Sequence, residues 1–233
     1  MESTPHPRTF GLVAGLGVGA GIFYYNALVD AHLAHGLSPR LLMVHADVRY
    51  VMAQAAARNT GQLADYLAAL LKQLALGGAE IASIPAFAPQ VCAAELAAIA
   101  PLPLISLLDT IAAAVEKQRF RRVALFGARV TMETQLFGTL SNTEVINPTP
   151  AEIDLIASTY VRVVEEARAS EEDFHRLRTL AHTLIEREYL DGILLAGTDL
   201  AFVFNPGNTD FPHLDGARLH VDAIMQQILA PPA

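Results

Sequence analysis

Two aspartates that follow apolar stretches are the residues best suited to acid–base chemistry. Asp199 lies in "AGTDLAF" beside Thr198, and Asp47 lies in "HADVRY" with Arg49 two residues later. A carboxyl group can take up or release a proton, and an arginine can bind a carboxylate through two parallel hydrogen bonds. Each aspartate also fits a plainer role, Asp199 as a helix cap and Asp47 as a solvated strand end paired locally with Arg49. The sequence leaves these alternatives open.

Two further segments could bind an anion through backbone N–H groups. Residues 15–21 read "GLGVGAG" and include Gly17, and glycines there let the backbone approach an anion at a helix start. A tight turn with close helix packing is the alternative, since the glycine spacing and the distance to Asp47 do not fit a dinucleotide fingerprint. Residues 127–134 read "GARVTMET", with Thr131 predicted to be a helix N-cap. Its helix start could hold a carboxylate, and capping alone is the alternative.

A loop after another apolar stretch is chemically bare. Residues 85–90 read "PAFAPQ", and Gln90 carries the one hydrogen-bonding side chain among them. Cys92 follows as the single cysteine of the chain, and we expect a buried, inert thiol inside a helix. No two histidines have the helical spacing of a zinc site, so no metal site is predicted. His220 is expected to have a structural role.

Composition excludes several classes of function. The 233 residues are 52% hydrophobic, and the net charge of -8 with a pI near 5.4 argues against binding to nucleic acid or anionic membranes. No apolar run is long enough to predict a membrane span, and the first residues do not resemble a secretory signal. A single cysteine fits a reducing cytoplasm.

Apolar stretches alternate with helix-length segments along the whole chain. The short apolar stretches, which lie near Gly, Pro or Asp, are predicted to be strands buried on both faces of parallel sheets: residues 9–15, 40–46, 80–85, 122–127, 144–147 and 192–197. The predicted helices are residues 20–34, 60–76, 90–98, 107–118, 131–140, 151–168, 171–189 and 216–229. Ser170 before Glu171 marks a capped helix start. This alternation indicates an α/β fold with the helices outside the sheets.

The α/β pattern runs twice. "LALGGAEIASIPAFAP" and "REYLDGILLAGTDLAF" each read as a helix end, a turn, an apolar strand, a loop and a new helix. We therefore expect two pseudo-symmetric lobes, each a short parallel sheet flanked by helices. Residues 1–105 plus 213–233 are assigned to the first lobe and residues 106–212 to the second. A cleft between the lobes, at the carboxyl ends of the strands, is the expected binding site.

These segments together resemble the aspartate/glutamate/hydantoin racemase superfamily, which includes maleate isomerases and arylmalonate decarboxylases. The resemblance spans nearly all of residues 9–229 and rests on the order and spacing of several motifs. They are "GLVAGLGVGAGIFYYNALV", "HADVRY", "ALFGARVTMETQLF", "VVEEA", "ILLAGTDL" and "HLDGARLHVDA". It implies a two-lobed α/β fold and an enzyme that needs no cofactor. Its racemases use two opposed cysteines, one of which removes the α-proton while the other returns a proton to the opposite face.

The resemblance fails at the cysteines. The first-lobe motif Cys-Asn-Thr-x-His falls on Ala86, Phe87, Ala88 and Gln90, and the second-lobe cysteine falls on Gly197. Thr198 is kept and Asp199 stands for the family's glutamate. The resemblance therefore implies that both catalytic thiols are replaced and that Phe87 makes the first-lobe wall of the cleft apolar.

The expected function is that of an altered enzyme of this superfamily. It would transfer a proton on a small carboxylate or carbonyl compound, as an isomerase or a related lyase. Asp47 and Asp199 would be acid and base, and Thr131 and Thr198 would bind a carboxylate or oxyanion. The alternative is a non-catalytic ligand-binding or regulatory relative that keeps the cleft. The resemblance also implies a possible homodimer.

Overall fold

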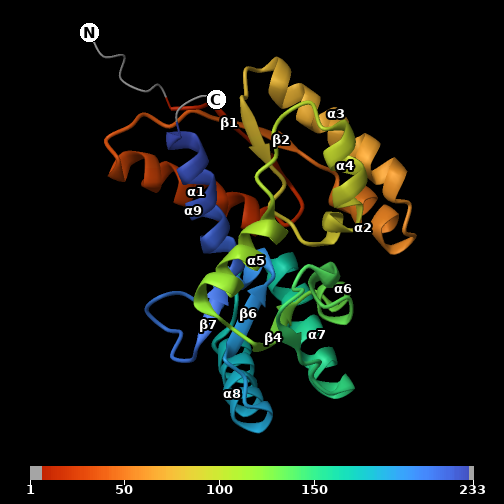
Figure 1. The fold of residues 1–233 in the computed structure, drawn as a ribbon, viewed down its shortest axis with the longest axis vertical. Helices are drawn as coiled ribbons and strands as arrows, with labels where there is room; N and C mark the ends of the chain where they lie inside the picture. Colours follow the sequence, from red (N-terminus) through yellow and green to blue (C-terminus); the bar gives the residue numbers. More distant parts are fainter. Residues whose placement is uncertain (1–6, 231–233) are drawn as a thin grey trace.

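A computed structural model of the protein describes residues 7–230 and shows two lobes, each built on a parallel sheet (Figure 1). The first sheet has the strand order β2-β1-β3, formed by β1 (Phe10–Ala14), β2 (Leu41–His45) and β3 (Ile81–Ser83). The second has the order β5-β4-β6-β7, formed by β4 (Arg122–Gly127), β5 (Glu144–Val145), β6 (Gly192–Ala196) and β7 (His213–Asp215). The expected α/β class and the two lobes are confirmed.

Helices cover both sheets. In chain order the first half contains α1 (Val18–Ala34), α2 (Val48–Ala56), α3 (Thr60–Leu76), the 3-10 helix η1 (Ala88–Cys92) and α4 (Ala93–Ile99). The second half contains α5 (Leu107–Gln118), α6 (Arg129–Glu133), the 3-10 helix η2 (Leu136–Gly138), α7 (Pro150–Glu166), α8 (Glu171–Glu188), the 3-10 helix η3 (Thr198–Phe202) and α9 (Gly216–Leu229). None of the helices within residues 7–230 combines the length and apolar character that crossing a bilayer requires.

The two predicted repeats occupy equivalent positions in the two sheets. Strand β3 pairs with the central strand β1 and leads into η1, while β6 pairs with the central strand β4 and leads into η3. Next to β3, an isolated parallel bridge pairs Ala82 with Leu104. Leu104 thus occupies the place in the first sheet that β7, which pairs with β6, occupies in the second. Helix α2 and strand β7 were not among the predicted elements.

The lobes exchange their last helices. Helix α5 follows the first-lobe chain, yet Leu107 and Ile111 are buried in the core of the second lobe with Val123 and Leu214. Helix α9 follows β7, yet its apolar face is buried against β1 and α1 in the first lobe. Of the residues 213–233 assigned to the first lobe, β7 is paired with β6 in the second sheet and α9 lies on the first. Figure 1 shows α5 at the junction of the lobes and α9 beside α1 in the first lobe.

His220 on α9 is part of a buried polar network in the first lobe. Its Nδ1 lies 3.0 Å from the Tyr24 hydroxyl, and its Nε2 lies 3.0 Å from the Ser83 hydroxyl and 3.1 Å from the carbonyl oxygen of Ile105. Burial lowers the pKa of His220 to about 4. The imidazole is therefore neutral at pH 7 and holds α1, α9 and β3 together, which is the structural role expected from the sequence.

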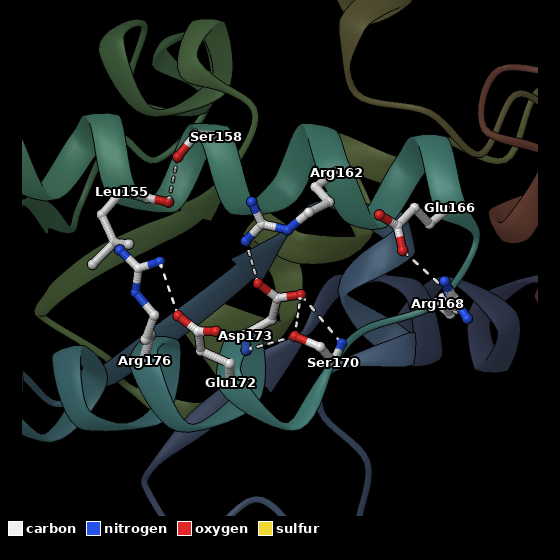
Figure 2. Close-up of polar contacts among 9 residues, drawn as sticks. All are labelled: Leu155, Ser158, Arg162, Glu166, Arg168, Ser170, Glu172, Asp173 and Arg176. Atoms are coloured by element: carbon white, nitrogen blue, oxygen red, sulfur yellow. Dashed lines mark hydrogen bonds and ion pairs between the residues drawn. The ribbon is translucent and has the colours of Figure 1, made fainter.

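The turn between α7 and α8 depends on one buried carboxylate (Figure 2). Asp173 accepts hydrogen bonds from the N–H and hydroxyl of Ser170, which caps α8, and forms an ion pair with Arg162 of α7. The arginine and the capping contacts lower the pKa of Asp173. The capped helix start predicted at Ser170 is confirmed.

We predict that Asp173→Ala lowers the free energy of unfolding by about 2 kcal/mol, because it removes a charged hydrogen-bond partner and a capping contact at once. Glu172→Ala is the matched control, since Glu172 is exposed and lies 3.7 Å from Arg176 on the same helix. It should change stability by less than about 0.5 kcal/mol. Urea unfolding at pH 7 measures both, and equal effects would contradict the assigned role of Asp173.

Candidate functional site

Asp199 is a buried carboxyl group at the junction of the lobes. It lies in the first turn of η3, directly after β6, and is 1% exposed. Its Oδ1 accepts a hydrogen bond of 3.0 Å from the backbone N–H of Ala20, in the first turn of α1. A side chain of the second lobe is therefore held by the helix that follows the glycine turn of the first lobe.

The glycines of that turn are required by the approach of Asp199. A Cβ atom on Gly17, whose φ is +144°, would lie 2.7 Å from Asp199 Oδ2. A Cβ atom on Gly19 would lie 2.6 Å from the ring of Phe202 and 3.0 Å from Asp199 Oδ1. The turn was predicted to receive an anion or to pack closely on its neighbours. Here it packs closely on an acidic side chain of the protein itself.

Burial gives Asp199 a pKa suited to proton transfer. Removal from water raises its pKa to about 6, while hydrogen bonds from the Ala20 N–H and the Thr198 hydroxyl lower it. Relative to 3.8, this shift corresponds to a penalty of about 3 kcal/mol for ionising the buried group. Both the acid and the carboxylate are thus accessible close to neutral pH, as a general acid or base requires.

Gly197 lies directly before η3. The ring of Tyr160 fills the space that a larger side chain at this position would occupy. A Cβ atom on Gly197 would overlap Cε2 of the Tyr160 ring and lie 2.8 Å from its Cζ. Burial and the nearby Asp199 raise the pKa of Tyr160, while the Thr198 hydroxyl and the N–H groups of Thr198 and Asp199 lower it through hydrogen bonds. The phenol therefore stays protonated at neutral pH, beside Thr198 and Asp199.

The chemically bare loop of the first lobe is packed into the protein interior. Ala86 and Phe87 are buried, and Phe87 belongs to the apolar core that extends through the second lobe. A Cβ atom on Gly216, at the start of α9, would lie 3.4 Å from Cζ of Phe87. The side-chain amide of Gln90 donates a hydrogen bond of 2.8 Å to the carbonyl oxygen of Ala86. Phe87, predicted to form an apolar wall of the cleft, is a core residue that joins the lobes.

Cys92 is the buried thiol that was predicted. It ends η1, which begins at Ala88, and its Sγ donates to the carbonyl oxygen of Pro89 at 3.2 Å. Burial and the nearby Glu95 raise its pKa to about 11. A thiol with this pKa is not a nucleophile or base at neutral pH.

Asp47 and Arg49 form the solvated arrangement that was the alternative to a catalytic role. Asp47 caps α2, with its Oδ1 accepting from the N–H groups of Arg49 at 2.9 Å and Tyr50 at 3.3 Å. Its side chain is 53% exposed, and the exposed Arg49 guanidinium lies 3.8 Å away. Within residues 7–230, no polar contact joins either side chain to Asp199.

Thr131 does not cap a helix, which corrects the sequence prediction. Helix α6 begins at Arg129 with Ala128 as its N-cap, so Thr131 lies inside the first turn. The N-cap is three residues earlier than predicted, because Ala128 has the extended backbone conformation of an N-cap. The Thr131 hydroxyl is fully buried and has no hydrogen-bond partner within residues 7–230. Such a group is costly to leave unpaired, and it is therefore a candidate to bind a ligand oxygen.

The structure brings together part of the predicted site. Four of the predicted residues converge at the lobe junction: Gly17, Gly197, Thr198 and Asp199. Within residues 7–230, Asp47 and Arg49 form no polar contact with Asp199. Sequence reasoning missed Ala20, which acts through its backbone, and Tyr160, which lies mid-helix without a motif around it. Among residues 7–230, no three His, Cys, Asp or Glu side chains are grouped as a metal ion would require.

Solved structures with the same fold are racemases and their relatives. An aspartate racemase homologue from Pyrococcus horikoshii OT3 has a TM-score of 0.80 and 19% sequence identity, covering 95% of this chain and 99% of that one. A putative Asp/Glu racemase from Yersinia pestis has a TM-score of 0.77 and 21% identity, with the same coverage. The aspartate racemase of Picrophilus torridus has a TM-score of 0.72 and 16% identity, covering 94% and 93%. No curated protein matches the sequence.

The family of the chain follows from its sequence as a whole. The family model described as Asp/Glu/Hydantoin racemase matches residues 13–224, from the end of β1 into α9. The chain belongs to the Asp/Glu/hydantoin racemase family.

Proposed function

We propose that the protein is a cofactor-independent enzyme that transfers a proton at a carbon next to a carboxylate or carbonyl group. The reaction would be an isomerisation in which one group removes and returns the proton, or the related cleavage of a lyase, because inversion as in a racemase needs a second proton donor on the opposite face. Asp199 carries this proposal, because it combines deep burial at the lobe junction with a pKa of about 6. A group with these properties can remove a proton from a weak carbon acid and return it near neutral pH.

The proposed proton transfer does not use a pair of thiols. The chain contains one cysteine, Cys92, whose thiol is buried and has a raised pKa. Asp199 is therefore assigned as the acid–base group. The Thr131 and Thr198 hydroxyls are assigned to a carboxylate or oxyanion of the ligand, since the first is buried without a partner. Asp47 has no part in the proposed step, because its side chain is exposed and caps α2, and the variants below test this.

A second candidate function is supported by the packing around Asp199. Tyr160 fills the space beside Gly197, and Phe87 is buried in the core instead of facing a cleft. A relative that binds a ligand without reacting would retain such a site. Binding without proton exchange distinguishes this candidate from the enzyme.

Proton exchange into small carboxylates tests the catalytic proposal. We predict that the protein, incubated in deuterated water with a panel of amino and hydroxy acids, exchanges the α-proton of at least one of them, as followed by NMR. The rate should rise with pH through about 6, because Asp199 acts as a base once it is ionised. Asp199→Asn should lower the rate about 100-fold or more.

Asp47→Asn is the matched control for this experiment. It makes the same substitution at an exposed aspartate that caps a helix. It should leave the exchange rate within about twofold, since Asn is as good a cap as Asp. A loss of exchange in Asp47→Asn with none in Asp199→Asn would refute the assignment of Asp199. Ligand binding with no exchange in the unmodified protein would favour the non-catalytic candidate.

The stability of Asp199→Asn has an expected pH dependence. Because the folded-state pKa of about 6 lies above the unfolded value of 3.8, the unfolded chain ionises first as pH rises, and folding is penalised. The penalty grows between about pH 4 and pH 6 and is complete above that range. Asp199→Asn removes it, so its stability relative to the unmodified protein should increase by about 3 kcal/mol from pH 3.5 to pH 8.

Urea unfolding at several pH values measures this difference. Asp47→Asn is again the control, as the same substitution at an exposed aspartate. A stability difference for Asp199→Asn that is constant with pH would show that Asp199 ionises in the folded protein as it does in the unfolded chain.

A further inference from the structure

We propose that Tyr160 controls access to Asp199, because its ring occupies the space that a ligand must enter to reach the carboxyl group. The proposal rests on the proposed function in placing the ligand beside Asp199. It goes further by assigning a role to a helix residue that neither the motifs nor the family match marks as part of the site.

The position of the ring is the first support. The ring of Tyr160, on α7, lies so close to Gly197 that even a Cβ atom there would overlap it. Gly197 directly follows the last residue of β6 and directly precedes Thr198 and Asp199. Any group that approaches the start of η3 from the side of Gly197 therefore meets the ring first.

The nearness of Tyr160 to Thr198 and Asp199 is the second support. Beyond the effect of burial, both residues influence the pKa of the Tyr160 hydroxyl, Asp199 through its charge and Thr198 through hydrogen bonding. An oxygen atom of a carboxylate ligand would use the N–H groups at the start of η3 at the same place. Tyr160 therefore occupies space that such a ligand needs.

The exposure of Tyr160 is the third support. Thr198 and Asp199 are almost fully buried, whereas Tyr160 is only partly buried. Tyr160 can therefore be reached from solvent, whereas the carboxyl group beside it cannot.

Rotation of one side chain is a simpler way to open this site than separation of the lobes. The lobes share their cores through Phe87 and through the exchanged helices α5 and α9, so separating them exposes apolar surface. Moving the Tyr160 ring breaks only the contacts of that ring. The structure therefore assigns the opening motion to Tyr160.

Thiol labelling tests the proposal without any substrate, so its result does not depend on whether the protein is an enzyme. Thr198→Cys places a thiol behind the ring with little change in size, and Ellman's reagent measures its reactivity. With Tyr160 present the introduced thiol should react slowly. With Tyr160→Ala added, its rate should increase about 100-fold. Tyr160→Phe, which keeps the ring, should stay within about threefold of the slow rate.

Two controls belong to the same measurement. The buried Cys92 reacts only when the protein opens globally, so it should stay slow in every variant and thereby separates local access from unfolding. Tyr25→Ala, at an exposed tyrosine of α1, should not change the rate at position 198. Tyr160→Leu is measured alongside and is expected to give an intermediate rate. Fast labelling at position 198 with Tyr160 in place, while Cys92 stays slow, would overturn the proposal.

Discussion

The buried carboxyl group of Asp199 is the constraint around which the junction of the two lobes is arranged. A carboxyl group removed from water needs hydrogen-bond donors and close neighbours without bulky side chains. Ala20 supplies a donor from the first lobe, and Gly17 and Gly19 leave the space that the carboxyl group and Phe202 occupy. The glycine-rich turn, the start of α1 and the start of η3 are therefore explained by one side chain. Its energetic cost is also what makes it chemically useful, since an aspartate stabilised by water would be fully ionised at neutral pH.

The exchange of α5 and α9 determines how the rest of the molecule supports that site. Each lobe completes its core with the helix that follows the other lobe's sheet, and Phe87 adds a further apolar link. The relative positions of Ala20 and Asp199 are therefore held by packing on both sides. Such a frame keeps a proton-transfer group fixed, and it confines motion to side chains at the junction.

The fold was predictable because its signal is repeated, whereas the site depends on burial, which one sequence shows poorly. Five-residue apolar strands such as β1 and β6 stand out beside their glycines and polar turns. Strand β7 was missed because its three residues, His213–Asp215, include two polar ones. Asp47 and Asp199 have similar local sequences, and only the tertiary structure separates an exposed helix cap from a buried acid. The residue type alone could not reveal this difference in burial.

Tyr160 shows why the residue type at position 197 does not by itself define the site. The space beside Gly197 is filled by the Tyr160 ring from α7, 37 positions earlier in the chain. The ring and the glycine are complementary, because any larger residue at 197 requires Tyr160 to move. The acid next to the start of η3 has a pKa raised to about 6 by burial. Under the proposal for Tyr160, the chemistry available at the junction depends on the position of that side chain as much as on the acid behind it.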